Sequence, residues 1–121
     1  GRERLVPPHK TNKEPMKFRD LKTVDVSARE WKDKVNGNSY FSAKVVLNFQ
    51  QANQETIEMP FQYGYGDYYQ QAAAEAIAKR FPRTKWAKKE EPLWRLRENG
   101  KTIRTNKEPN CTQKRCKELA A

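Results

Sequence analysis

Alternation of apolar and polar side chains between residues 41 and 63 is the feature that most limits how this chain folds. In residues 41–49 every second position is apolar, from Phe41 to Phe49, and Val46 is the one apolar residue on the other parity. Residues 57–63 alternate in the same way. Because two is the period of a β-strand, we expect each segment to be a strand that buries one face.

A third strand is expected before these two. Residues 24–28 also alternate, and Asn36-Gly37, a strong signal for a two-residue hairpin turn, follows. Trp31 lies on the opposite parity, which indicates either a β-bulge or a capping box at residues 27–30 that opens a short helix; we favour the strand. Pro60 cannot donate a backbone hydrogen bond, so its strand is placed at a sheet edge, or ends at a bulge.

Residues 68–81 are expected to form a helix, because their apolar residues recur four positions apart with alanines beside them. Asp67 is its expected N-cap, Gln70 completes a capping box, and Pro82 ends the helix. Together the strands and the helix define the expected core: Phe41, Val45, Leu47, Phe49, Ile57, Met59, Phe61, Tyr63, Tyr69, Ala73, Ile77 and Phe81.

These elements predict an α+β fold in which one helix packs on a three-stranded antiparallel meander. A second hairpin around Asn99-Gly100, with strands at 93–98 and 101–105, and a short helix at 112–119 are expected to be appended. The predicted organisation is a flexible basic arm at 1–20, an α+β core domain at 21–82, and a basic hairpin-helix module at 83–121.

Positive charge is concentrated near the end of the sequence. The net charge is +10, and residues 79–121 contribute fourteen basic and five acidic residues, whereas residues 21–78 are slightly acidic. Such a field attracts polyanions, of which nucleic acid is the first expectation, ahead of an acidic protein surface or anionic lipid. Solubility alone is the alternative explanation.

The second predicted hairpin carries the most specific functional hypothesis. A two-residue loop at Asn99-Gly100 would place Arg95, Arg97 and Arg104 on one face and two apolar residues on the other. Like charges side by side are unfavourable unless that face is solvated or holds an anion, and guanidinium groups match phosphate. Further basic residues surround this hairpin: Lys85, Lys88, Lys89, Lys114, Arg115 and Lys117.

Aromatic residues supply the candidates for base stacking. Tyr65 and Tyr68 lie in a glycine-containing turn, and Trp86 lies among lysines, a pattern that suits single-stranded nucleic acid. The alternative is structural: the glycines build the turn, and one or both of Trp86 and Trp94 attach the C-terminal module. We favour the structural role for Trp94.

The residues give little support for catalysis, a cofactor or a metal site. The single histidine is His9, and Cys111 and Cys116 supply too few ligands for structural zinc. We therefore predict no enzyme, no cofactor and no metal. With two cysteines, no apolar stretch long enough to span a bilayer and no secretory leader, a cytoplasmic location away from the membrane is expected. The oligomeric state is left open.

Two family resemblances follow from these motifs. The three strands, the Gly64-Tyr65-Gly66 turn and the alanine-rich helix resemble the second half of a double-stranded-RNA-binding domain, in which lysines begin the helix; here Asp67 and two tyrosines occupy those positions. Residues 36–40 and 60–67, within a match over residues 23–81, resemble small proteins encoded by phages and prophages. That resemblance implies an accessory viral protein in a bacterial host.

The expected function is nucleic-acid binding with little sequence readout, through the basic C-terminal module. The alternative is a protein-interaction module that binds or inhibits an acidic host factor through exposed tyrosines. A structural virion component with a polyanion-facing tail is a third possibility.

Overall fold

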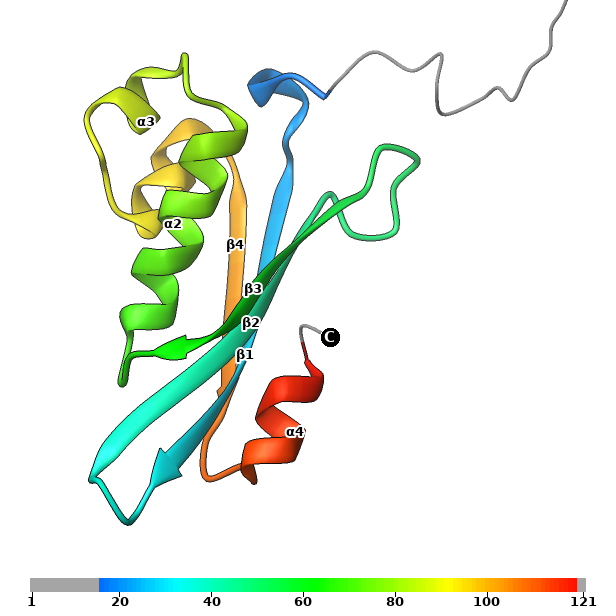
Figure 1. Cartoon of the computed structure of the whole chain (residues 1–121). Coiled ribbons are helices and arrows are strands. Elements are labelled where there is room, and N and C mark those ends of the chain that lie inside the picture. Colours follow the sequence, from blue (N-terminus) through cyan, green and yellow to red (C-terminus); the bar gives the residue numbers. More distant parts are fainter. Residues whose placement is uncertain (1–15, 120–121) are drawn as a thin grey trace, which may run out of the picture.

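The computed structural model describes residues 16–119 of the chain. In these residues a mixed sheet of four strands has the order β3-β2-β1-β4. The α2 helix covers one face of the sheet together with α3 and η2, and α4 lies against the other face (Figure 1). The elements are η1 Phe18–Asp20, β1 Thr23–Asp33, β2 Asn38–Leu47, β3 Glu55–Tyr63, α2 Tyr68–Arg80, α3 Lys85–Lys88, η2 Leu93–Asn99, β4 Thr102–Glu108 and α4 Gln113–Glu118.

The predicted antiparallel meander is confirmed for β1, β2 and β3. The β1–β2 connection is a four-residue loop, residues 34–37, because Asp33 pairs with Asn38. The expected two-residue turn at Asn36-Gly37 therefore does not form, and of these two residues only Gly37, at φ of +76°, has positive φ. β1 and β2 pair without interruption from Val24↔Leu47 to Asp33↔Asn38. Trp31 therefore marks neither a bulge nor a helix. It belongs to a regular strand and points to the face opposite α2.

A bulge in β3 overturns part of the expected core. Met59 pairs with Ala43 but Gln62 pairs with Phe41, so β3 carries one extra residue where Pro60 lies. Both predictions for Pro60, an edge strand and a bulge, are confirmed. The extra residue reverses the parity, and Phe61 stacks on Tyr40 of the other face with ring centroids 5.3 Å apart.

Two further aromatic residues of the expected core are exposed. Tyr63, beyond the bulge, is 60% exposed. Phe49 is 48% exposed because β2 ends at Leu47 and Asn48 takes a left-handed conformation with φ of +56°. The chain turns away from the sheet there, so strand periodicity no longer sets which residue is buried.

The helix is confirmed, with Tyr69, Ala73, Ile77 and Phe81 buried against the sheet. The expected capping box does not form, because the Asp67 side chain makes no cap hydrogen bond. Backbone hydrogen bonds are found at this end instead: the Tyr68 N–H donates to the Tyr65 carbonyl at 3.2 Å, and the Gln70 N–H donates to the Asp67 carbonyl at 2.9 Å.

The predicted hairpin at residues 93–105 is wrong. Residues 93–99 form the η2 3-10 helix, and β4 pairs parallel to β1, from Thr23↔Thr102 onward. Leu93 and Leu96, three positions apart, are both buried, which suits the period of a 3-10 helix. Gly100, at φ of +81°, caps that helix, a role for which glycine is as well suited as for a hairpin turn.

The C-terminal third shares one core with the rest of the fold. Trp86, Leu93, Leu96 and Ile103 belong to the same buried cluster as the strands and α2. Of the arm predicted at residues 1–20, Met16 is buried and residues 18–20 form η1. Residues 1–15, with His9, lie outside the described residues.

Candidate nucleic-acid interface

The three arginines of the expected hairpin do not form one anion-binding face. Arg95 pairs with Glu98 at 2.9 Å, and Arg97 donates to the Ile103 carbonyl at 3.2 Å. Arg104 forms two hydrogen bonds to Asp25, at 2.5 and 3.0 Å, and this carboxylate raises the pKa of the guanidinium. Arg104 comes from β4 and the other two from η2, so their charges are separated and two of them are balanced by carboxylates.

The basic residues of α4 lie on the other face of the sheet. Arg115 pairs with Glu108 at 2.7 Å, and this hydrogen bond lowers the pKa of the Glu108 carboxyl group. The Lys117 ammonium lies 5.1 Å from the centroid of the Phe61 ring. Lys114 is exposed on the same helix. These three cations are separated by the sheet from the lysines of α3 (Figure 1).

The lysines of α3 are presented to solvent by a well-defined helical turn. Thr84 caps the turn, its hydroxyl accepting from the Ala87 N–H at 3.1 Å. Lys85, Lys88 and Lys89 are exposed, whereas Trp86 is buried and donates its Nε1–H to the Pro92 carbonyl at 3.0 Å.

Each of the two tryptophans has the opposite exposure to the one expected from the sequence. Trp86 is only 3% exposed and offers no ring for a base to stack on. Trp94, which was expected to be structural, is 50% exposed.

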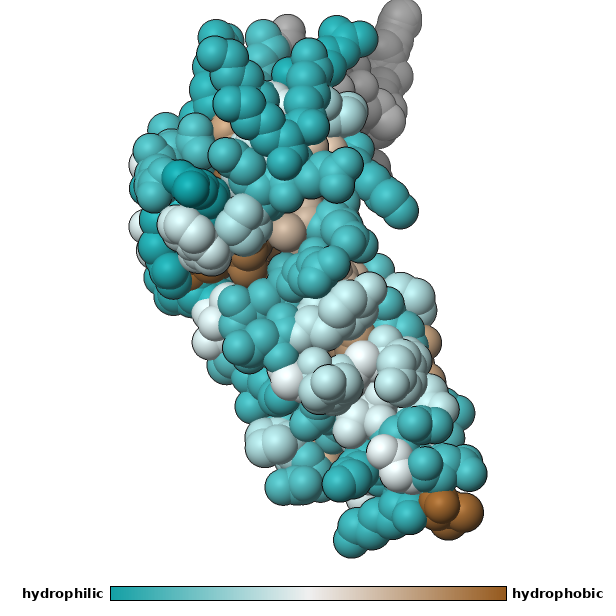
Figure 2. Space-filling view, turned by 90° about the vertical axis from the view of Figure 1, so that its left-hand side faces the viewer, coloured by the Kyte–Doolittle hydropathy of each residue, from teal (hydrophilic) through white to brown (hydrophobic). Residues whose placement is uncertain are grey.

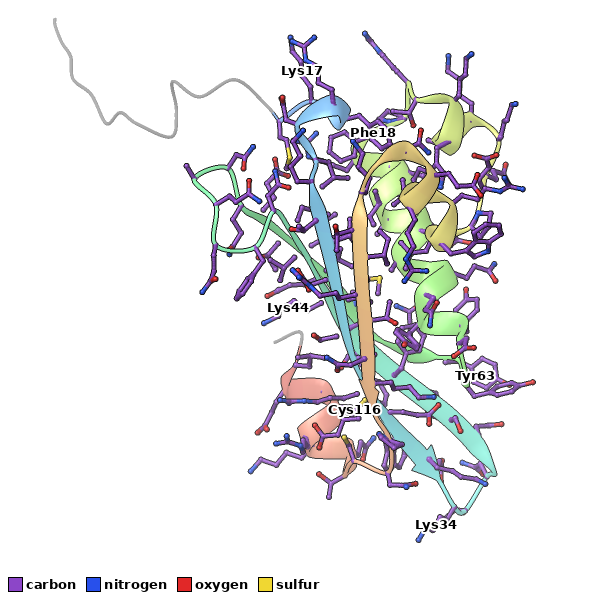
Figure 3. All side chains as sticks on the ribbon, turned by 180° about the vertical axis from the view of Figure 1, so that it is seen from behind. Lys17, Phe18, Lys34, Lys44, Tyr63 and Cys116 are labelled. Carbon is purple, nitrogen blue, oxygen red and sulfur yellow. The ribbon has the colours of Figure 1, made fainter. Side chains whose placement is uncertain are left out.

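A second basic segment meets α3 at the same end of the molecule. The Phe18 ring of η1 packs edge-on against Phe81 at 5.6 Å, and Arg80 donates to the Met16 carbonyl at 3.3 Å while it pairs with Glu55. These contacts place η1 beside the end of α2, as Figure 3 shows for Lys17 and Phe18. We call the exposed cations gathered there the basic end: Lys17, Arg19, Lys22, Arg83, Lys85, Lys88 and Lys89.

The basic end holds more positive charge than its acidic neighbours balance. Among residues 16–119, no carboxylate lies within 4.0 Å of any of its seven cationic groups. Beneath it the Lys101 ammonium donates to the Phe18 carbonyl at 2.8 Å. Burial, and then the charge of Lys22, lower the pKa of Lys101, while Asp20 raises it. The positive charge of Lys22 therefore makes the charged form of the Lys101 side chain less favourable.

An open hollow lies between η1 and the turn that joins α2 to α3. Lys17 and Arg83 line it, together with the apolar surfaces of Phe18, Phe81 and Pro82. Cations around a concave surface can contact a phosphate backbone from two sides. Lys17, Arg19, Lys22 and Arg83 are not among the contact residues predicted from the sequence, because they belong to segments that only the folded chain brings together.

The predicted stacking tyrosines lie far from the basic end. Tyr65 is 69% exposed and Tyr68 is 39% exposed, at the start of α2, whereas the basic end adjoins its last turn. A helix of 13 residues is about 20 Å long, so roughly that length of α2 lies between the two sites. Glu30 and Lys107 hold the tyrosine turn through hydrogen bonds to the N–H and C=O of Gly66.

No family model, curated protein or solved structure matches this chain. Within residues 16–119 no helix is long and apolar enough to cross a membrane. The same residues contain no group of three or more His, Cys, Asp or Glu side chains placed to hold a metal ion.

Proposed function

We propose that this protein binds nucleic acid through its basic end and contacts phosphates with little readout of sequence. The observation that carries the proposal is the convergence of seven exposed cations from two segments, residues 17–22 and 83–89, on one end of the molecule. Lysine ammonium groups on flexible side chains suit a phosphate backbone, which presents charge without fixed geometry relative to the protein.

The surroundings of the basic end argue for backbone contact rather than base recognition. Trp86 is buried, and Phe18 packs between Phe81 and the Lys101 ammonium, which lies 4.4 Å from its ring centroid. The aromatic side chains near these cations are thus engaged in the fold. Sequence-specific reading needs side chains that reach base edges or stack on bases.

The test is fluorescence anisotropy of labelled single-stranded and double-stranded DNA and RNA, titrated with the protein over a series of salt concentrations. Each phosphate that the basic end neutralises should add about 0.7–0.9 to the slope of log K against log salt. Binding in the micromolar range, with a slope of several and little change between sequences, is the expected result. No binding at near-physiological salt would contradict the proposal.

An acidic protein is the second candidate partner for the same basic end. The basic end favours it by charge alone, since a surface rich in carboxylates resembles a polyanion. The exposed tyrosines do not add to that case, because they lie at the other end of α2, beside Asp67. A pull-down that survives nuclease treatment would favour this candidate. On the phage resemblance, we place either activity in the cytoplasm of a bacterial host.

A further inference from the structure

A groove runs along the side of α2 that faces α3 and η2. Ala74 and Ala78 of α2 line it together with Glu75, Glu90, Glu91 and Trp94. We call it the acidic groove; Gln71, Lys79, Trp86 and Leu93 are also among its lining residues. Figure 2 looks onto this side of the molecule and shows brown, apolar atoms at the bottom of a hollow between teal, hydrophilic ones.

The charge of this groove is opposite to that of the whole chain. Three carboxylates and one ammonium, that of Lys79, line it, although the net charge of the protein is +10. Glu75 accepts a hydrogen bond from the Gln71 amide at 3.4 Å. Among residues 16–119 no cation lies within 4.0 Å of any of the three carboxylates. The lining favours a cationic group over phosphate, although Lys88 and Lys89 of the basic end directly precede Glu90.

Exposed aromatic side chains border the acidic groove. Trp94 is 50% exposed even though the Arg95 guanidinium lies 4.9 Å from its ring centroid. Gln71 lines both the groove and the neighbouring hollow of the tyrosine turn, where Tyr65 and Tyr68 are exposed. Tyrosine and tryptophan are the residues that most often anchor protein–protein interfaces.

We propose that the acidic groove binds a basic peptide segment of a partner protein. Arginine or lysine side chains of that segment would pair with Glu90 and Glu91, and an apolar side chain would lie on Ala74 and Ala78 beside Trp94. On α2 the lining runs from Gln70 to Lys79, about 14 Å of helix, which matches about four residues of extended chain. The groove adjoins the basic end, because Glu90 directly follows Lys89, but its lining has the opposite charge, so a polyanion and a basic partner would occupy neighbouring sites.

The test uses the full-length protein and three fluorescein-labelled peptides of equal length. One alternates arginine with leucine, the second has glycine in place of leucine, and the third has glutamate in place of arginine. We expect micromolar affinity for the first, about tenfold weaker binding of the second, and none of the third. In the E90Q/E91Q variant the first peptide should bind about tenfold more weakly, because the paired charges are lost. The control E58Q/E118Q changes the charge equally elsewhere and should bind as the native protein does.

The W94A variant gives a second, charge-independent measurement, and circular dichroism checks that each variant is folded. We expect W94A to bind the arginine-leucine peptide at least fivefold more weakly than the native protein does, because the aromatic anchor is lost. Unchanged affinity in both E90Q/E91Q and W94A, or equal binding of the glutamate peptide, would overturn the proposal. So would self-association of the protein that E90Q/E91Q abolishes, since a second copy would then be the occupant. Binding of labelled DNA, measured in parallel, reports on the basic end; W94A should leave it unchanged, and E90Q/E91Q should leave it unchanged or strengthen it, because negative charge is removed beside Lys88 and Lys89.

Discussion

At the residue scale, Asn48 explains why the chain leaves the sheet where it does. Its side-chain carbonyl accepts from the N–H groups of Lys22 and Thr23 at 2.7 and 3.3 Å, and its amide donates to the Asp20 carbonyl at 2.9 Å. This completely buried side chain joins η1, β1 and the end of β2. The sequence alternation ends at this point, but it could not reveal that a polar residue would be buried and Phe49 exposed.

Replacing Asn48 by alanine should lower the free energy of unfolding by about 2–3 kcal/mol, because buried N–H and C=O groups lose their partners. Urea denaturation monitored by circular dichroism measures the change. The exposed Gln51→Ala variant is the control and should stay within about 0.5 kcal/mol of the native protein. An Asn48→Ala variant as stable as that control would show that the network contributes nothing.

The buried thiol of Cys116 leads us to expect that the free energy of unfolding depends on pH. Its thiol is fully buried and donates to the Arg29 carbonyl at 3.0 Å, and burial raises the pKa of the thiol. The pKa of this thiol is therefore higher in the folded protein than in the unfolded chain, where it is about 8.5. Its contribution to the free energy of unfolding is complete below the unfolded-state pKa and is lost as the pH rises through the folded-state pKa.

Stability of the native protein should therefore fall as pH rises above about 8.5, and Cys116→Ala should lose less stability over the same range. Urea midpoints measured in reducing buffer on both sides of that pH provide the comparison. Parallel pH profiles for the two proteins would mean that this thiol does not contribute.

At the element scale, local patterns predicted the meander and α2 but not β4. Period-two alternation with a glycine-containing turn signal between the segments is enough to indicate neighbouring antiparallel strands, although the β1–β2 loop has four residues and not the expected two. A parallel strand depends on a crossover connection and on pairing with β1, about 80 residues earlier. Asn99-Gly100 was misread because a left-handed glycine suits both a hairpin and a helix C-cap. The bulge at Pro60 likewise reassigns Phe61 only once the pairing partners are known.

Two substitutions distinguish the η2 cap from a hairpin turn. Both central residues of the expected hairpin turn would need positive φ, so alanine would be unfavourable at Asn99 and at Gly100. In the structure only Gly100 has positive φ. Gly100→Ala should therefore destabilise the protein by about 1 kcal/mol, and Asn99→Ala should be within about 0.5 kcal/mol of neutral. Equal destabilisation by both, in urea denaturation, would favour the hairpin.

At the scale of the whole molecule, the fold separates charges that the sequence places together. Composition predicted a polyanion-binding protein, and Lys85, Lys88 and Lys89 remain candidates at the basic end. Arg95, Arg104 and Arg115 instead pair with carboxylates from their own or neighbouring elements. No local pattern indicates the Arg104–Asp25 pair or the approach of η1 to α3, because both arise from tertiary packing. The Arg95–Glu98 pair is local, at i and i+3, but it needs the 3-10 helix that the hairpin prediction excluded.

The central claim is that position, and not net charge, determines where nucleic acid binds. Two variants with the same change in charge test it directly: K85Q/K88Q/K89Q at the basic end, and R95Q/R104Q/R115Q at the paired arginines. Anisotropy with labelled DNA over a salt series is the measurement. We predict that the lysine variant lowers the salt slope by about 2–3 and weakens binding, while the arginine variant changes neither appreciably. Equal losses in both variants, or a loss only in the arginine variant, would contradict the account.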